Sequence, residues 1–257
     1  MIKIENLHKS FGKNQVLKGI DLSFSTGKIS AILGPNGSGK TTLIKSLLGM
    51  CLPSAGGIRF NGELVKGKWN YRRQIGYLPQ IARFPDNLRV AELFRMIKDL
   101  RGEPADEGPL IKQFKLEPFL QKRLGTLSGG TRQKVNIVQT FMFDNPVIVL
   151  DEPTAGLDPV AMIALKELIE AEKQKGKTIL VTTHIMNFVD EIADEVVFLL
   201  EGKIHYQGTL ESLKNKYREP NLERAIAKIL VNQEAIATPY RQNGKVKGMP
   251  QLSTIKI

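Results

Sequence analysis

The segment Gly34-Pro-Asn-Gly-Ser-Gly-Lys-Thr-Thr42 satisfies the pattern G-x-x-x-x-G-K-[ST] in full, and it decides the fold of the chain around it. Its glycines let the backbone curl so that successive N–H groups point inward, toward the position of phosphate oxygens. An apolar run at residues 29–33 precedes it, and a helical pattern at residues 40–49 adds the positive end of a helix dipole. A turn that only resembles a phosphate loop is a much weaker interpretation here. The segment therefore predicts nucleotide binding.

We expect every residue of this phosphate loop (residues 34–42) to contact the nucleotide. The Lys40 ammonium can reach the β- and γ-phosphates, and the Thr41 hydroxyl can ligate Mg²⁺. Thr42 can donate to a phosphate from the same helical turn. The predicted cofactors are therefore ATP and Mg²⁺. The predicted nucleotide ligands are Gly34, Pro35, Asn36, Gly37, Ser38, Gly39, Lys40, Thr41 and Thr42.

Two carboxylates follow a second apolar strand. Residues 147–150 are Val-Ile-Val-Leu, and Asp151 and Glu152 come directly after them. A buried strand would expose these charges at its carboxyl end, where ligands bind in open α/β sheets. Asp151 is then suited to hold Mg²⁺, and Glu152 to orient or deprotonate the water that attacks the γ-phosphate. The alternative is an acidic helix N-terminus, which Pro153 would also fit.

Short apolar runs alternate with helical patterns along the chain. Strands are predicted at residues 29–33, 147–150 and 178–182, and helices at residues 40–49, 159–175 and 186–193. This alternation predicts a parallel sheet covered on both faces.

The remaining segments surround that core. The expected elements are short antiparallel strands in residues 1–30, a strand and turn at 58–62, helices over 87–145 with breaks at 102–109 and 124–130, a hairpin at 195–204, a short helix at 222–230 and a polar basic tail from 232.

Composition and charge limit the class of protein. The chain has 257 residues, of which 42% are hydrophobic, and no apolar run approaches the ~20 residues that cross a bilayer. Its N-terminus does not resemble a signal peptide, and a single cysteine, Cys51, excludes an internal disulfide and fits a reducing compartment. We therefore expect a cytoplasmic protein. The net charge of +11 allows nucleic-acid binding, contact with an anionic membrane surface, or simply solvated lysines.

A third motif makes the pattern specific. Leu127-Ser-Gly-Gly-Thr-Arg-Gln133 precedes the acidic strand and, together with the two nucleotide motifs, resembles the signature of ATP-binding cassette (ABC) ATPases. Ser128, Gly129 and Gly130 open a helix, so backbone N–H groups and a hydroxyl are available to an anion. Taken alone, an ordinary capped helix start would be the favoured interpretation. Thr131 stands where the family usually has glutamine.

The resemblance implies roles for four further residues. Gln80 resembles the glutamine that contacts Mg²⁺ and links to the transmembrane subunit, and Asp158 closes the loop that crosses between two cassettes. His184 resembles the switch histidine that contacts the γ-phosphate. Phe11 resembles the aromatic residue that stacks on adenine, usually tyrosine, although a core phenylalanine is nearly as good an interpretation.

The family fold that the resemblance implies is an α/β P-loop NTPase. It has a RecA-like parallel sheet core, an N-terminal antiparallel β subdomain and a helical subdomain at about residues 81–145 that carries the signature. The resemblance covers residues 1–215, and residues 216–257 would form a short C-terminal helix and a basic tail.

The family mechanism implies two partners. Two cassettes pair head to tail around two ATP molecules, and each site joins Lys40 and Glu152 of one chain to Ser128 and Gly130 of a second copy. The expected function is an ATPase that powers a separate transmembrane permease from the inner face of the cell membrane. Residues 81–93, with Phe84 and Pro85 expected to be exposed, form the candidate docking surface, and packing within the helical lobe is the alternative.

The short chain is similar to ABC-2 exporters, and its signature is similar to that of the copper-linked system that matures nitrous oxide reductase. The alternative function is an ABC ATPase that acts on nucleic acid or ribosomes, which the positive charge could serve. No nucleic acid is expected, because such family members carry two cassettes or a long coiled-coil insertion, and neither fits this chain. A non-hydrolysing regulatory module and a phosphate-loop kinase explain fewer of the motifs.

Overall fold

The computed structural model describes residues 2–237, and its centre is a six-stranded sheet. Five strands run parallel in the order β9-β3-β8-β7-β6, and β10 pairs antiparallel with β9 at the edge. Every residue of β3, β7 and β8 is buried, as expected of parallel strands with both faces covered. The strands are β3 (Ile29–Leu33), β6 (Ile75–Leu78), β7 (Val147–Asp151), β8 (Thr178–Thr182), β9 (Glu195–Leu200) and β10 (Lys203–Thr209). The predicted parallel core is confirmed.

A second sheet, antiparallel throughout, is built mostly from the N-terminal part of the chain. Its order is β2-β1-β4-β5, with β1 (Ile2–Phe11), β2 (Asn14–Phe24), β4 (Ala55–Phe60) and β5 (Glu63–Leu64). The antiparallel subdomain is confirmed, but the expectation that β1 and β2 are short was wrong. Gly19 lies inside β2 with φ +74 at a register shift, so it forms a bulge and does not end the strand.

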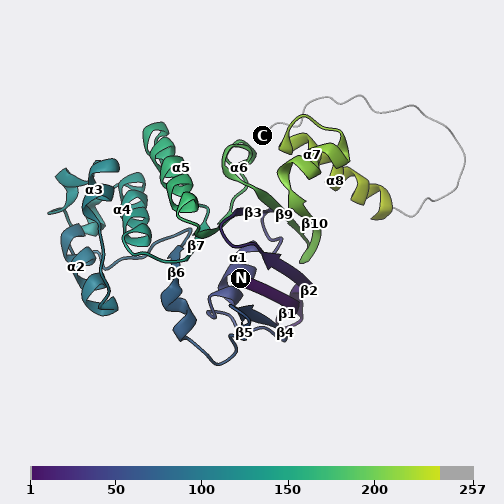
Figure 1. Cartoon of the computed structure of the whole chain (residues 1–257), viewed down its shortest axis with the longest axis horizontal. Helices are drawn as coiled ribbons and strands as arrows, with labels where there is room; N and C mark the ends of the chain where they lie inside the picture. Colours follow the sequence, from purple (N-terminus) through teal and green to yellow (C-terminus); the bar gives the residue numbers. More distant parts are fainter. Residues whose placement is uncertain (1, 238–257) are drawn as a thin grey trace, which may run out of the picture.

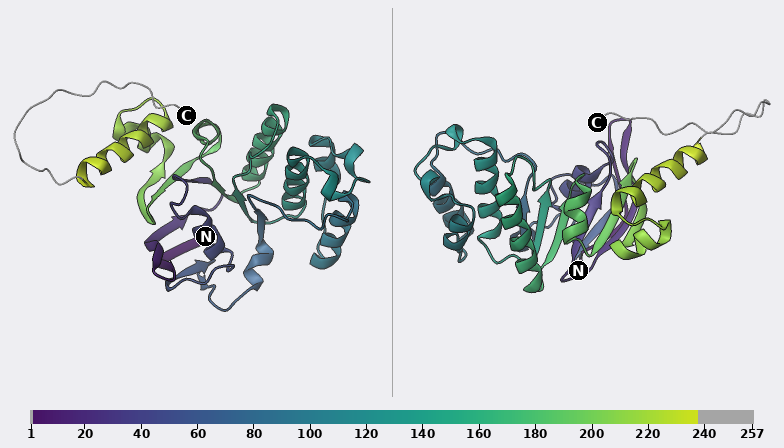
Figure 2. Two further views of the ribbon diagram at one scale, coloured as in Figure 1. Left: turned by 180° about the vertical axis from the view of Figure 1, so that it is seen from behind. Right: turned by 90° about the horizontal axis from the view of Figure 1, so that it is seen from above.

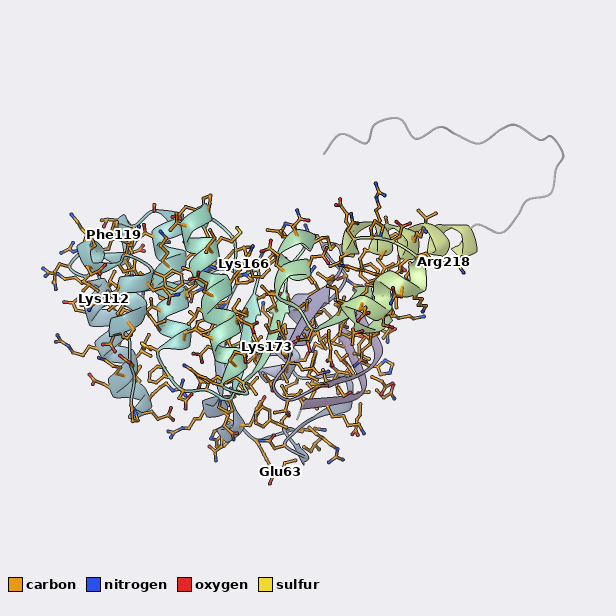
Figure 3. All side chains as sticks on the ribbon, turned by 45° about the horizontal axis from the view of Figure 1, so that its top comes forward. Glu63, Lys112, Phe119, Lys166, Lys173 and Arg218 are labelled. Carbon is orange, nitrogen blue, oxygen red and sulfur yellow. The ribbon has the colours of Figure 1, made fainter. Side chains whose placement is uncertain are left out.

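Eight α-helices and three short 3-10 helices complete the part of the chain that the structure describes. The α-helices are α1 (Lys40–Leu47), α2 (Val90–Arg101), α3 (Gly108–Gln113), α4 (Gly129–Phe141), α5 (Pro159–Gln174), α6 (Met186–Ile192), α7 (Leu210–Tyr217) and α8 (Leu222–Ala237). Helices α2, α3 and α4, here called the helical lobe, lie at one end of the molecule, and α7 and α8 lie at the other (Figures 1 and 2). Figure 3 shows Lys112 and Phe119 at the outer end of this lobe, Lys166 and Lys173 along α5, and Glu63 in the antiparallel sheet.

Three groups of buried side chains hold these parts together. One joins the helical lobe to α5, α6 and one face of the parallel sheet. The second fills the space between the two sheets and packs around α1, and the third packs α7 and α8 against β3, β9 and β10. Because α1 is clamped by the second group, the loop that precedes it is held by rigid elements on both sides.

Several elements differ from their predictions. Strand β6 and helix α7 were not predicted, and α7 crosses the expected domain boundary at residue 215. Helix α8 extends to Ala237, so residues 232–237 are helical and not part of a tail, whereas residues 238–257 lie outside the described residues. Phe84 is half-buried against the core of the helical lobe. Within residues 2–237, no helix has the length and apolarity to span a bilayer.

Candidate nucleotide site

The phosphate loop connects β3 to α1 at the carboxyl edge of the parallel sheet. Gly34 passes so close to β9 that a Cβ atom there would lie 2.1 Å from the Leu199 carbonyl oxygen, so only glycine fits. Gly39, the residue before α1, has a φ of +110, which favours glycine for a second reason. The loop therefore has its shape because two positions exclude side chains.

Lys40 is the first residue of α1 and is only 8% exposed. Its ammonium donates to the carbonyl oxygens of Gly34, at 2.7 Å, and Pro35, at 3.2 Å. Burial lowers the pKa of Lys40, while the nearby charges of Glu152 and Asp151 act in the opposite direction. The lysine thus lies inside the loop as a buried cation that two backbone oxygens hold in place.

A cavity of about 310 Å³ opens beside this loop. Within residues 2–237, the buried Ser38 hydroxyl on the loop has no hydrogen-bond partner, and such a group is rare in a folded protein unless a ligand or water completes it. The predicted residues that line the cavity are Asn36, Gly37, Ser38, Gly39, Lys40, Thr41, Thr42, Gln80, Asp151 and Glu152. Hydroxyls, a buried cation and carboxylates in one cavity fit a magnesium-bound nucleoside triphosphate.

The acidic strand end lines the same cavity as two residues of the antiparallel sheet's β1–β2 hairpin. Asp151 ends β7, and its register partner on β8 is Thr182. The Thr182 hydroxyl donates to Asp151 Oδ1, and the Glu152 N–H lies 3.3 Å from the same hydroxyl and 2.9 Å from the Thr182 carbonyl oxygen. Burial and the charge of Glu152 raise the pKa of Asp151, although the hydrogen bond from Thr182 and the charge of Lys40 oppose this shift.

Glu152 adopts a left-handed backbone conformation with φ +49, which is uncommon for a residue with a side chain. Its carboxylate meets His184, whose Nδ1 lies 3.0 and 3.1 Å from the two carboxylate oxygens. A carboxylate only accepts hydrogen bonds, so Nδ1 carries the hydrogen. The His184 side chain is 67% exposed and Glu152 is buried, so the pair joins the cavity wall to the surface.

Gln80 lines the cavity, whereas Phe11 pairs with a residue that lines it. Gln80 is exposed and follows β6. Phe11 ends β1 opposite Asn14, which lines the cavity, and the Lys9 ammonium lies 4.8 Å from the centre of its ring. Phe11 is 55% exposed, so the alternative of a core phenylalanine was wrong.

The signature residues do not lie in this cavity. Ser128 caps α4, because its hydroxyl accepts a hydrogen bond from the Thr131 N–H at 3.2 Å. Ser128 and Gly129 are exposed, and Gly130 packs against the loop that precedes α5. Asp158 caps α5 and forms a 2.7 Å ion pair with Lys134, which holds the pKa of Asp158 below its usual range. The structure therefore separates the signature residues and Asp158 from the phosphate loop of the same chain.

Three residues at this site were missed. Asn14 and Val16 line the cavity from the β1–β2 hairpin, and Thr182 connects Asp151 to Glu152. The first two carry no motif. The hydroxyl at the carboxyl end of β8, directly after the apolar residues 179–181, was the available signal for Thr182.

Comparison with known proteins identifies the family to which this chain belongs. The family model for ABC transporters matches residues 17–155, which include the phosphate loop, the signature residues and both carboxylates. The chain belongs to the ABC transporter family. A lantibiotic transport ATP-binding protein, SrtF of Streptococcus pyogenes, is 34% identical over 224 residues, which are 84% of this chain and 96% of that protein.

Solved structures of ABC cassettes agree with this assignment. An ATP-binding subunit of an ABC transporter is 31% identical, has a TM-score of 0.84, and is matched over 90% of this chain and 99% of its own. The dimeric post-hydrolysis cassette MJ0796, bound to ADP and Pi, is 25% identical with a TM-score of 0.71, over 81% of this chain and 98% of its own. This ABC cassette is therefore an ATP-binding subunit and an ATPase. The copper-linked subgroup stays a prediction.

Proposed function

We propose that two copies of this ABC cassette bind two Mg-ATP molecules between them and hydrolyse them to drive a separate membrane permease. One observation carries the proposal. Lys40, Asp151 and Glu152 gather in one cavity, while the exposed start of α4 at residues 128–130 lies outside that cavity. Each chain thus has a phosphate-binding half and a separate anion-binding helix start, and a second copy in head-to-tail orientation would complete both.

Each residue of the cavity has its own role in binding or hydrolysis. Thr41, Asp151 and Gln80 would hold Mg²⁺, which supplies charge neutralisation at the β- and γ-phosphates. Lys40 exchanges its contacts with the loop carbonyls for phosphate oxygens. Glu152 accepts a hydrogen bond from the attacking water and takes its proton, while His184 holds the carboxylate in position. Phe11 stacks on the adenine from the end of β1.

The permease partner would place this chain at the inner face of the cell membrane. The proposed docking surface at residues 81–93 is supported by Ile81, whose side chain is 72% exposed. Phe84 belongs to the packing of the helical lobe, so the contact surface is smaller than the sequence predicted.

Substitution of Glu152 tests the proposal. In Glu152→Gln, ATP turnover should fall by about 10²- to 10⁴-fold, the contribution of a general base, while ATP affinity stays intact. Light scattering should then detect a dimer that forms only with ATP. Glu167→Gln, an exposed carboxylate on α5, is the control and should keep the parental rate. Parental turnover in Glu152→Gln, or a rate linear in protein concentration from a chain that stays monomeric with ATP, would contradict the proposal.

A further inference from the structure

Helix α4 carries a stripe of buried polar side chains that the chemistry above does not use. Gln133 is 7% exposed, Asn136 1% and Thr140 4%. Their spacing of three and four residues places them on one face of the helix. Buried polar groups cost stability unless they are hydrogen-bonded, so their partners show what the stripe does.

Each amide of the stripe donates to a backbone carbonyl beside a residue of the nucleotide site. Gln133 Nε2 lies 3.0 Å from the carbonyl oxygen of Pro153, the residue after Glu152. Asn136 Nδ2 lies 3.2 Å from the carbonyl oxygen of Pro79, the residue before Gln80. The Thr140 hydroxyl lies 2.8 Å from the Asn136 carbonyl oxygen of its own helix and 3.3 Å from the Tyr77 carbonyl oxygen in β6, so its main partner is within α4.

The loop after Glu152 rests on the first turns of α4 at two further points. A Cβ atom on Gly130 would lie 2.6 Å from the Gly156 carbonyl oxygen, so the two backbones touch. Lys134 is paired with Asp158 at the end of that loop. The Thr182 carbonyl oxygen accepts the hydrogen bond of the Glu152 N–H, so the strained conformation of Glu152 is fixed from β8 on one side and from α4 on the other.

We propose that Gln133 and Asn136 are positioning residues. They connect the backbone beside Glu152 and Gln80 to α4, the helix that presents residues 128–130 to a second copy. The inference rests on the proposed function. Because a helix moves as a unit, a shift of the α4 start moves the backbone beside both residues in the same chain. Contact of residues 128–130 with the nucleotide of one site thereby sets the geometry of the other site.

Gln133→Met tests the first half, since it keeps the length and volume of the side chain and removes the donor. We expect kcat to fall by about 10- to 100-fold, as a displacement near 1 Å at a reacting group does, with KM for ATP unchanged. Gln113→Met is the matched control, because Gln113 Nε2 also donates to a backbone carbonyl, that of Ala164 on α5, away from the site. Its kcat should equal the parental value.

Two outcomes would overturn the role of Gln133. One is parental kcat in Gln133→Met. The other is failure of Glu152→Gln/Gln133→Met to form the ATP-dependent dimer that Glu152→Gln forms, since that would show a structural role at the α4 start. If Glu152→Gln hydrolyses ATP at the parental rate, the proposed function is wrong. That outcome is distinguishable from one that overturns only the role of Gln133.

Asn136→Leu tests the second half through the metal. Mn²⁺ binding in the presence of ATP, followed by electron paramagnetic resonance, should weaken by about 10-fold, as loss of an outer-shell contact does. ATP affinity without metal should not change. Mn²⁺ affinity equal to that of the parent would overturn the role of Asn136.

Discussion

Two helices of this ABC cassette begin at glycine-rich segments, and their surroundings differ in almost every respect. Helix α1 starts at Gly39 with no side-chain cap, beside a buried lysine and two buried carboxylates. Helix α4 starts at Ser128, whose own hydroxyl caps it, at an exposed surface outside the cavity. The first start belongs to a cavity whose phosphate-binding groups all come from one chain. The second start is capped by its own side chain and would contribute to a nucleotide site only in a second copy.

Among the substitutions that test this comparison, loss of Lys40 should have the largest effect on ATPase activity. Lys40→Ala removes the buried cation of the α1 start, so kcat/KM for ATP should fall by about 10³-fold, with weaker nucleotide binding as part of the loss. Lys45→Ala, on the exposed side of the same helix, should keep the rate within about twofold. Equal effects of the two substitutions in a steady-state ATPase assay would remove Lys40 from its assigned role.

Gly129→Asp should show most clearly that the starts of α1 and α4 have different functions. A Cβ atom at Gly129 meets nothing within 4 Å, and a carboxylate in the first turn stabilises a helix, so the chain should melt at the parental temperature or slightly above it. A negative charge where a phosphate of the second copy should bind would lower ATPase activity by about 10²-fold. ATP affinity at dilute, monomeric protein should not change, and parental ATPase activity would argue against a composite site.

Thr182→Val should have an intermediate effect, because Thr182 supports the two carboxylates of the cavity without lining it. The substitution keeps the volume of the side chain and removes the donor to Asp151. It also removes the more distant of the two acceptors of the Glu152 N–H, while the Thr182 carbonyl oxygen stays. We expect kcat to fall by about 10-fold, the scale of a lost supporting contact. Thr182→Ser keeps the hydroxyl and should recover most of the rate; if it behaves like valine, packing and not hydrogen bonding is responsible.

Asp151→Asn should produce the smallest change, a rise in melting temperature without nucleotide. Burial raises the folded-state pKa of Asp151 above its unfolded value, so the ionised side chain opposes folding at neutral pH. This cost disappears as the pH falls through the folded pKa toward the unfolded value. Asparagine removes it and still accepts the hydrogen bond of Thr182. Thermal melts should show a gap between variant and parent that narrows on acidification, and a variant that melts lower at pH 7 would contradict this account.

The phosphate loop and the acidic strand end were predictable because local chemistry specifies them. Gly34 and Gly39 are required by backbone geometry, and the apolar runs of β3, β7 and β8 are buried on both faces wherever they lie in the sheet. Strand β6 escaped prediction because Ile75–Leu78 is short and includes Gly76 and Tyr77, and only its pairing with β7 makes it a strand. Phe84 was wrongly predicted to be exposed, because its burial depends on the helical lobe packed around it.

The sequence alone determined that this chain has a phosphate loop, two carboxylates after a buried strand and a second anion-binding helix start, because each is encoded within a few consecutive residues. Only the tertiary structure decided that His184 meets Glu152, that Thr182 lies between the two carboxylates, and that α4 reaches the backbone beside both Glu152 and Gln80. These contacts join residues far apart in the chain, and their formation depends on which strands pair and where a helix packs.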